Sequence, residues 1–172
     1  KTFKQNGKIY LMIKKIFFTL SISAFLISSV FAAGSSDSGS NETYYDKAVT
    51  YINSAKKYEK KEKNKKAIAK YKKAQKLLLK SNMEKPNNAD TLNYLGFTTR
   101  KLGDFSKGEK YYLQGLAINP NHKGINEYLG ELYVATNRID LAKERLEVLK
   151  NCSCEEYSDL KDIIEGNKTS KY

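Results

Sequence analysis

Residues 93–96 read Asn-Tyr-Leu-Gly, and residues 127–130 read Glu-Tyr-Leu-Gly. The two glycines, Gly96 and Gly130, are separated by about 34 residues. A motif that returns after about 20–50 residues indicates a chain built from repeated supersecondary units, and this period is typical of a helix-turn-helix unit. The spacing therefore predicts two successive pairs of helices that share one architecture.

Further positions of the two units correspond when both are numbered from their first residue. When Gly96 is counted as position 8 of its unit, positions 20, 27 and 32 hold Gly108, Gly115 and Pro120. The matching positions of the next unit hold Gly130, Ala142, Leu149 and Cys154. An earlier and looser unit has Ala67 at position 20, and its distance to Gly108 exceeds the period by about seven residues, so this unit is longer.

This pattern resembles the tetratricopeptide repeat (TPR), in which small residues let paired helices approach closely and a proline ends the second helix. The resemblance implies an all-α fold, a right-handed superhelix of three TPR-like helical hairpins plus a C-terminal capping helix. Residues 119–122 resemble the turn between repeats in that family. The ending from Cys152 to Tyr157 is similar to that of small exported TPR proteins of Gram-negative bacteria.

The resemblance also sets the domain limits. We expect a TPR domain over 43–166, with repeats at about 48–86, 89–122 and 123–154, a cap at 155–165 and a tail at 167–172. The first helices of the three hairpins are expected near 44–60, 88–101 and 123–136. The surplus residues of the first unit are expected to lengthen its second helix over 75–80, until Ser81 and Asn82 break it.

An export signal is expected before this domain. Met12, Ile13 and two lysines precede an apolar run over 16–30, and Val30 and Ala32 are small residues placed for a signal peptidase. We therefore predict a signal peptide at 12–32, cleaved after Ala32, and a flexible linker at 33–42. Residues 1–11 fit no part of that signal and are interpreted as an upstream artefact. The alternative is an uncleaved membrane anchor.

Composition narrows the class of function. The chain carries +12, of which +7 remains beyond the expected cleavage site, and 28 lysines face only three arginines. Since phosphate and base recognition favours the guanidinium group, nucleic-acid binding is not expected. A single histidine, His122, and two cysteines provide few ligands for a zinc site and no histidine-based triad, so neither a metal, a cofactor nor catalysis is expected.

Family resemblance places ligand contacts on the inner face of the first helices. These positions indicate a partner-binding groove that takes a protein or peptide segment with an apolar anchor and a basic residue. Phe97 and Arg100 are expected to carry most of the binding energy. The predicted groove residues are Ile52, Lys56, Glu59, Asp90, Asn93, Phe97, Arg100, Glu127 and Glu131.

Two further features leave alternatives open. Twelve lysines between Lys56 and Lys80 face only Glu59 and Glu62, so this helix pair could dock weakly on an anionic membrane surface. Cys152 and Cys154 are expected to form a local disulfide in an oxidising compartment, with a redox-active pair or free thiols as the other possibilities. The leading hypothesis is a periplasmic interaction or scaffold module without catalysis. Its rivals are an envelope-surface structural protein and a redox factor.

Overall fold

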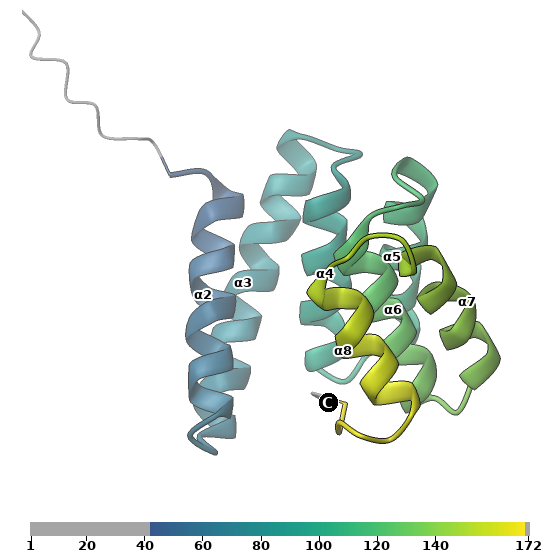
Figure 1. Ribbon diagram of the computed structural model, residues 1–172. Helices are drawn as coiled ribbons and strands as arrows, with labels where there is room; N and C mark the ends of the chain where they lie inside the picture. The colour runs from purple at the N-terminus through teal and green to yellow at the C-terminus, as the bar shows by residue number, and fades with distance from the viewer. Residues whose placement is uncertain (1–41, 171–172) are drawn as a thin grey trace, which may run out of the picture. The chain divides into compact units, whose positions relative to one another are not determined.

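The computed structural model describes residues 42–170, which form seven helices and no strand (Figure 1). The helices are α2 (Tyr44–Glu59), α3 (Asn64–Glu84), α4 (Ala89–Lys101), α5 (Phe105–Ile118), α6 (Lys123–Ala135), α7 (Ile139–Leu149) and α8 (Glu155–Ile164). The predicted all-α fold is confirmed for this part of the chain. The expected upstream segment, signal peptide and almost all of the linker lie outside the described residues.

Consecutive helices form three hairpins. Helix α2 packs against α3, α4 against α5 and α6 against α7, and neighbouring hairpins meet through α3 with α4 and α5 with α6. Helix α8 packs on α6 and α7 at the end of the series (Figure 1). A chain in which each unit packs mainly on the next has the architecture of a helical repeat, and the final helix covers the apolar face that the last unit would otherwise expose.

The repeated small residues lie where helices touch. A Cβ atom at Gly96 would lie 2.4 Å from Cε1 of Tyr112, so α5 could not pack on α4 in its present position. A Cβ atom at Gly130 would lie 2.5 Å from Cδ2 of Leu160 on α8. Carbon atoms in ordinary contact are about 3.5–4.0 Å apart. The glycine of the repeated Tyr-Leu-Gly motif is thus a helix-packing position in both units.

The end of α3 corrects one expectation. The sequence analysis expects Ser81 and Asn82 to break this helix, but it continues to Glu84. Lys85 then leaves the helical conformation with φ −131° and ψ 81°, and Pro86 follows. A residue before proline is disfavoured in the α region because the proline ring clashes with its backbone. Pro86 therefore ends the helix, while serine and asparagine are accommodated inside it.

A proline also ends α5, one repeat later. Asn119, which precedes Pro120, has φ −135° and ψ 91°, close to the values at Lys85. In each turn, the second residue after the proline caps the next helix with its side chain. Asn88 Oδ1 accepts a hydrogen bond from a backbone N–H of α4 at 2.8 Å, and His122 Nδ1 accepts one from α6 at 3.1 Å. The turns between hairpins are therefore built alike, as the sequence predicts.

The turns inside the hairpins are also equivalent. Glu62, Gly103 and Asn137 each adopt a left-handed backbone, with φ of 56°, 96° and 57°. Gly103 and Asn137 are one repeat period apart, whereas Glu62 keeps the longer offset of the first unit. Left-handed backbone favours glycine and tolerates asparagine, because other side chains crowd the following carbonyl. Glu62 is thus the strained member of this set.

Candidate functional site

The predicted groove residues lie on α2, α4 and α6, but most of them are not accessible. Phe97, Arg100 and Glu131 are 1%, 2% and 0% exposed. Ile52, Asn93 and Glu127 are buried as well. Of the predicted set, Lys56 and Glu59 are partly exposed and Asp90 is exposed. The expectation that Phe97 and Arg100 present themselves to a partner is therefore corrected: both side chains belong to the packing between hairpins.

Phe97 is enclosed by aromatic side chains from its neighbours. Its ring centroid lies 5.7 Å from that of Tyr71 on α3 and 5.1 Å from that of Tyr128 on α6. Lys56 Nζ lies 4.8 Å from the Phe97 centroid and donates a hydrogen bond to Tyr128 Oη at 3.3 Å. Edge-on and tilted aromatic pairs stabilise cores beyond their burial. This cluster holds the three hairpins together.

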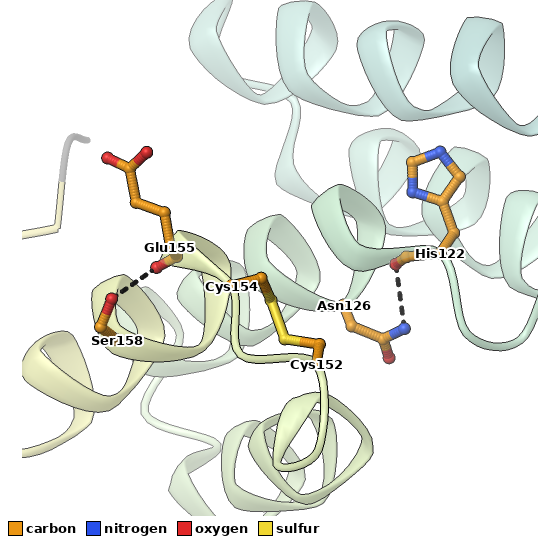
Figure 2. The surroundings of a disulfide bond; sticks show 6 residues. All are labelled: His122, Asn126, Cys152, Cys154, Glu155 and Ser158. Atoms are coloured by element: carbon orange, nitrogen blue, oxygen red, sulfur yellow. Dashed lines mark hydrogen bonds between the residues drawn. A yellow bond between two sulfur atoms is a disulfide. The ribbon is translucent and has the colours of Figure 1, made fainter.

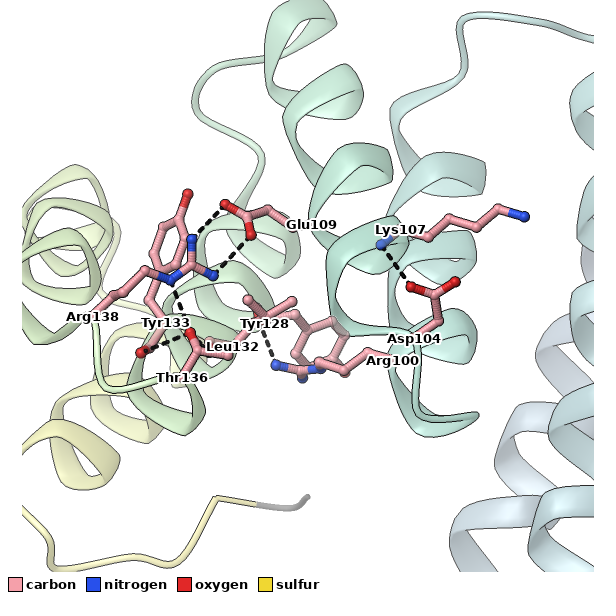
Figure 3. Close-up of polar contacts among 9 residues, drawn as sticks. All are labelled: Arg100, Asp104, Lys107, Glu109, Tyr128, Leu132, Tyr133, Thr136 and Arg138. Carbon is pink, nitrogen blue, oxygen red and sulfur yellow. Dashed lines mark hydrogen bonds and ion pairs between the residues drawn. The ribbon is translucent and has the colours of Figure 1, made fainter.

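Arg100 joins α4 to α6 through two contacts, of which Figure 3 draws the one with Tyr128. Its Nη2 atom lies 3.1 Å from Glu131 Oε2, and both side chains are fully buried. Its Nη1 atom donates to the backbone carbonyl of Tyr128 at 2.7 Å. A buried charge is tolerated only when it is paired and hydrogen-bonded. The pair is therefore a structural tie between the second and third hairpins.

An open pocket nevertheless lies between α4 and α6, with a volume of about 540 Å³. We call it the α4–α6 pocket. Its lining residues are Ala89, Asp90, Asn93, Tyr94, Asn119, Asn121, His122, Lys123, Gly124, Glu127, Tyr128 and Glu156. Three predicted groove residues, Asp90, Asn93 and Glu127, line it. The tyrosines, His122, Lys123 and Glu156 were not predicted as site residues, although both tyrosines belong to the repeated Tyr-Leu-Gly motif.

Asn93 lines this pocket and carries a buried acceptor without a hydrogen-bond partner among the described residues. The residue is 7% exposed, and its Oδ1 atom has no hydrogen-bond partner among the described residues. Gly124 leaves room for the Asn93 side chain, because a Cβ atom at position 124 would lie 2.9 Å from Asn93 Nδ2. Buried polar groups are nearly always hydrogen-bonded, and an exception calls for an explanation. The oxygen is itself enclosed, so a ligand N–H donor would reach it only after the Asn93 side chain turned.

The charge in the pocket is mainly negative. Carboxylates come from Asp90, Glu127 and Glu156, whereas Lys123 is the one lysine that lines it. His122 Nε2 lies 3.0 Å from Asp90 Oδ1, so the histidine that caps α6 also contacts the start of α4. Carboxylates beside aromatic rings are the environment that an ammonium or guanidinium group prefers.

The tyrosines of the pocket stay neutral. Burial raises the pKa of Tyr128 well above its ordinary value, and the nearby carboxylate of Glu127 raises it further. Burial, together with the Asp90 carboxylate, also raises the pKa of Tyr94. A neutral phenol keeps its hydroxyl proton as a donor, and its ring face carries the negative potential that attracts cations. Both effects favour a positively charged ligand group.

Neither a cluster of metal-ligating side chains nor a helix able to span a membrane occurs in the described part of the chain. Residues 42–170 contain no group of three or more His, Cys, Asp or Glu residues placed to hold a metal ion. Over the same residues, no helix combines the length and apolar character needed to cross a membrane. Both ring nitrogens of His122 are engaged, one in capping α6 and the other with Asp90.

Cys152 and Cys154 lie between α7 and α8 and are joined by a disulfide (Figure 2). Their Cα atoms are 5.2 Å apart, within the range that a disulfide spans. Ser153 between them has a left-handed backbone with φ 46°, and Cys154 is the residue before α8. That the pair is oxidised in the cell stays a prediction.

Comparison with known proteins gives similarity at the level of structure. No family model matches the sequence, and no curated protein matches it. The first TPR domain of Spaghetti (RPAP3), solved with the HSP90 peptide SRMEEVD, is 20% identical with a TM-score of 0.46, covering 74% of this chain and 97% of that one. The Arabidopsis OM64 TPR domain is 13% identical, also with a TM-score of 0.46, covering 73% and 99%. These likenesses concern the fold alone.

Proposed function

We propose that the protein is an interaction module that binds a segment of a partner protein in the α4–α6 pocket and performs no catalysis. The observation that carries the proposal is the open α4–α6 pocket of about 540 Å³, walled by the carboxylates of Asp90, Glu127 and Glu156 and by Tyr94 and Tyr128. Backbone N–H groups are the donors that every peptide offers. The partner segment would supply some of them to the carboxylate oxygens that line the pocket.

The same pocket favours a basic side chain on that segment. A lysine or arginine placed between Asp90, Glu127 and Glu156 would meet carboxylates on three elements and lie beside Tyr94 and Tyr128, which line the same pocket. A cation over an aromatic ring contributes about 0.5–2 kcal/mol, more as water is excluded. The apolar anchor expected from the sequence is not part of this proposal, because Phe97 is buried.

Peptide selection on the exported protein tests the proposal. Random peptides should be enriched in lysine or arginine, and Asp90→Asn combined with Glu156→Gln should weaken the selected peptides about tenfold, or about 1.4 kcal/mol. The control replaces two exposed carboxylates on α7, Asp140→Asn and Glu144→Gln, with the same change in net charge. Enrichment of acidic peptides, or equal weakening by both double variants, would contradict the proposal.

We further propose a periplasmic location in a Gram-negative bacterium. Its support is the sequence alone: the lysines after Met12, the apolar run, and the small residues at Val30 and Ala32. The intact mass of the exported protein should correspond to a chain that begins at Ala33. A mature chain that still carries Met12 would show that the segment is an uncleaved anchor.

A further inference from the structure

The outer surface of α3 combines exposed apolar and basic side chains. Ile68, Leu79 and Met83 are 43%, 42% and 82% exposed. Lys72 and Lys76 are exposed between them, so the five residues follow one stripe at three- and four-residue spacing. We call this stripe the α3 outer face. Three exposed apolar side chains in line on a helix are a feature that a solvated surface does not need.

The opposite side of α3 is its core side. Ala67, Tyr71, Ala74 and Leu78 are buried there against α2 and α4. The α3 outer face therefore points away from the hairpins, and none of its residues lines the α4–α6 pocket. Whatever contacts this face can do so without displacing any part of the described fold.

Further lysines are held beside this stripe by tyrosines of α2. Lys70 and Lys73 lie 5.1 and 5.8 Å from the ring centroid of Tyr51. Lys80 lies 5.1 Å from the centroid of Tyr44. Lysine side chains bury their apolar stems and keep the ammonium group in water. The contacts place the three ammonium groups over tyrosine rings at the edge of the α3 outer face, so their positive charge stays beside the stripe.

Little negative charge opposes these lysines. Helix α3 contains no acidic residue before Glu84, which is at its end. Of the two acidic residues in the lysine-rich stretch, Glu59 contacts Lys101 at 2.8 Å and accepts a hydrogen bond from Tyr71 Oη. Glu62 lies in the turn before α3. Helix α3 thus carries seven lysines and one acidic residue, with exposed apolar side chains between the lysines.

We propose that the α3 outer face docks on an anionic lipid bilayer. A surface helix that lies in the membrane interface buries an apolar stripe and places lysines at the head groups, each lysine contributing about 1 kcal/mol. The apolar side chains select the occupant, because a soluble polyanion would satisfy the lysines but leave Ile68, Leu79 and Met83 in water. This docking is independent of peptide binding in the α4–α6 pocket.

A tryptophan reporter tests insertion directly. The chain has no tryptophan, so Met83→Trp in the full exported protein gives a single fluorophore. With vesicles that contain phosphatidylglycerol, its emission should shift to shorter wavelength and be quenched by lipids brominated along the acyl chain. With soluble polyphosphate, the emission should not shift. A reporter that stays in water on phosphatidylglycerol vesicles would overturn the proposal.

Variants of the lysines and of the apolar residues separate the electrostatic from the hydrophobic contribution to vesicle binding. Lys72→Gln with Lys76→Gln should lower vesicle partitioning about 25-fold, since about 1 kcal/mol for each lysine is roughly a fivefold change. Leu79→Ser with Met83→Ser should lower it about tenfold or more.

The matched control removes the same charge elsewhere. Lys107→Gln with Lys143→Gln replaces exposed lysines on α5 and α7 and should change partitioning less than threefold, because neither residue is on α3. Equal losses in both lysine pairs, or unchanged binding after the serine substitutions, would overturn the proposal. Peptide binding should be unaffected in all these variants, so loss of docking is distinguishable from failure of the pocket.

Discussion

The first and second hairpins use different small residues where their helices pack closely. At positions 8, 20 and 27 the first hairpin has alanine each time, and all three side chains are at most 2% exposed. The second hairpin has glycine at the same three positions. The alanines are Ala55, Ala67 and Ala74, and the glycines are Gly96, Gly108 and Gly115.

The glycines of the second hairpin affect which charged side chain is buried between its helices. A Cβ atom at Gly108 would lie 3.1 Å from the carbonyl oxygen of Gly96 and 3.3 Å from Arg100 Cβ, so the glycine lets α5 approach α4 and helps to enclose Arg100. In the first hairpin the equivalent of Arg100 is Glu59, whose side chain is 33% exposed. Each glycine costs about 1 kcal/mol of helix propensity against alanine. The second hairpin thus loses local helix stability and gains a buried ion pair with the third hairpin.

The largest loss of stability should come from removing the Arg100–Glu131 ion pair. We expect Arg100→Ala to lower the free energy of unfolding by about 3–5 kcal/mol, because Glu131 stays buried after its partner is gone. Glu59→Ala, at the matching and more exposed position, should cost only about 1 kcal/mol. Urea unfolding followed by circular dichroism measures both. Similar losses for the two variants would remove the contrast between the hairpins.

A double replacement sharpens this result. Arg100→Met combined with Glu131→Leu takes away both charges and keeps much of the volume, so most of the stability should return. If the double variant is no more stable than Arg100→Ala, the loss arises from packing around Arg100 and not from an uncompensated charge.

The second effect concerns the glycines themselves. Gly96→Ala places a methyl group against the ring of Tyr112, and we expect a net loss of about 1–2 kcal/mol after the gain in helix propensity. At Gly115 the added Cβ would clash only with Ile125 Cδ1, the end of a flexible side chain, so Gly115→Ala should change stability by less than about 1 kcal/mol. Thermal melting of both variants checks the order. The reverse order would show that the closeness of α4 and α5 is not set at Gly96.

The third effect concerns how the hairpins end. Pro86 and Pro120 follow the first and second hairpins, and one repeat period after Pro120 the third has Cys154, bonded to Cys152. Because the ring is small, the disulfide removes little entropy from the unfolded chain, and Cys152→Ser with Cys154→Ser should cost about 1.5 kcal/mol or less. Denaturant unfolding measures it, and alkylation without reductant counts the thiols. Two reactive thiols in the native exported protein would exclude the disulfide.

The smallest effect should be a gain in the first hairpin. Glu62 has the left-handed backbone that glycine provides at Gly103 in the second hairpin. Glu62→Gly should therefore raise the free energy of unfolding by about 0.5–1 kcal/mol, since relief of strain exceeds the added freedom of the unfolded chain. A loss of stability would mean that the turn is not strained as its backbone suggests.

The sequence by itself determined the repeat, the helix pairs and the turns between them. Gly96 and Gly130 recur at a fixed period because each fills one contact between helices, and Pro86 and Pro120 act on the backbone before them. Such effects depend on near neighbours in the chain or on a close helix contact at a fixed position of the unit, so they can be predicted from the order of residues. Asp90, Asn93 and Glu127 were recognised as site residues for the same reason.

Only the tertiary structure decided which inner-face residues a partner can reach. Phe97 and Arg100 occupy the positions expected to bind, yet side chains from α2, α3 and α6 surround them. Likewise, Glu156 joins the α4–α6 pocket from α8, far along the chain. Burial depends on how closely three hairpins and a cap approach one another, which is a sum of contacts between distant segments. Periodicity gives the face of a helix, whereas packing determines what is left exposed on it.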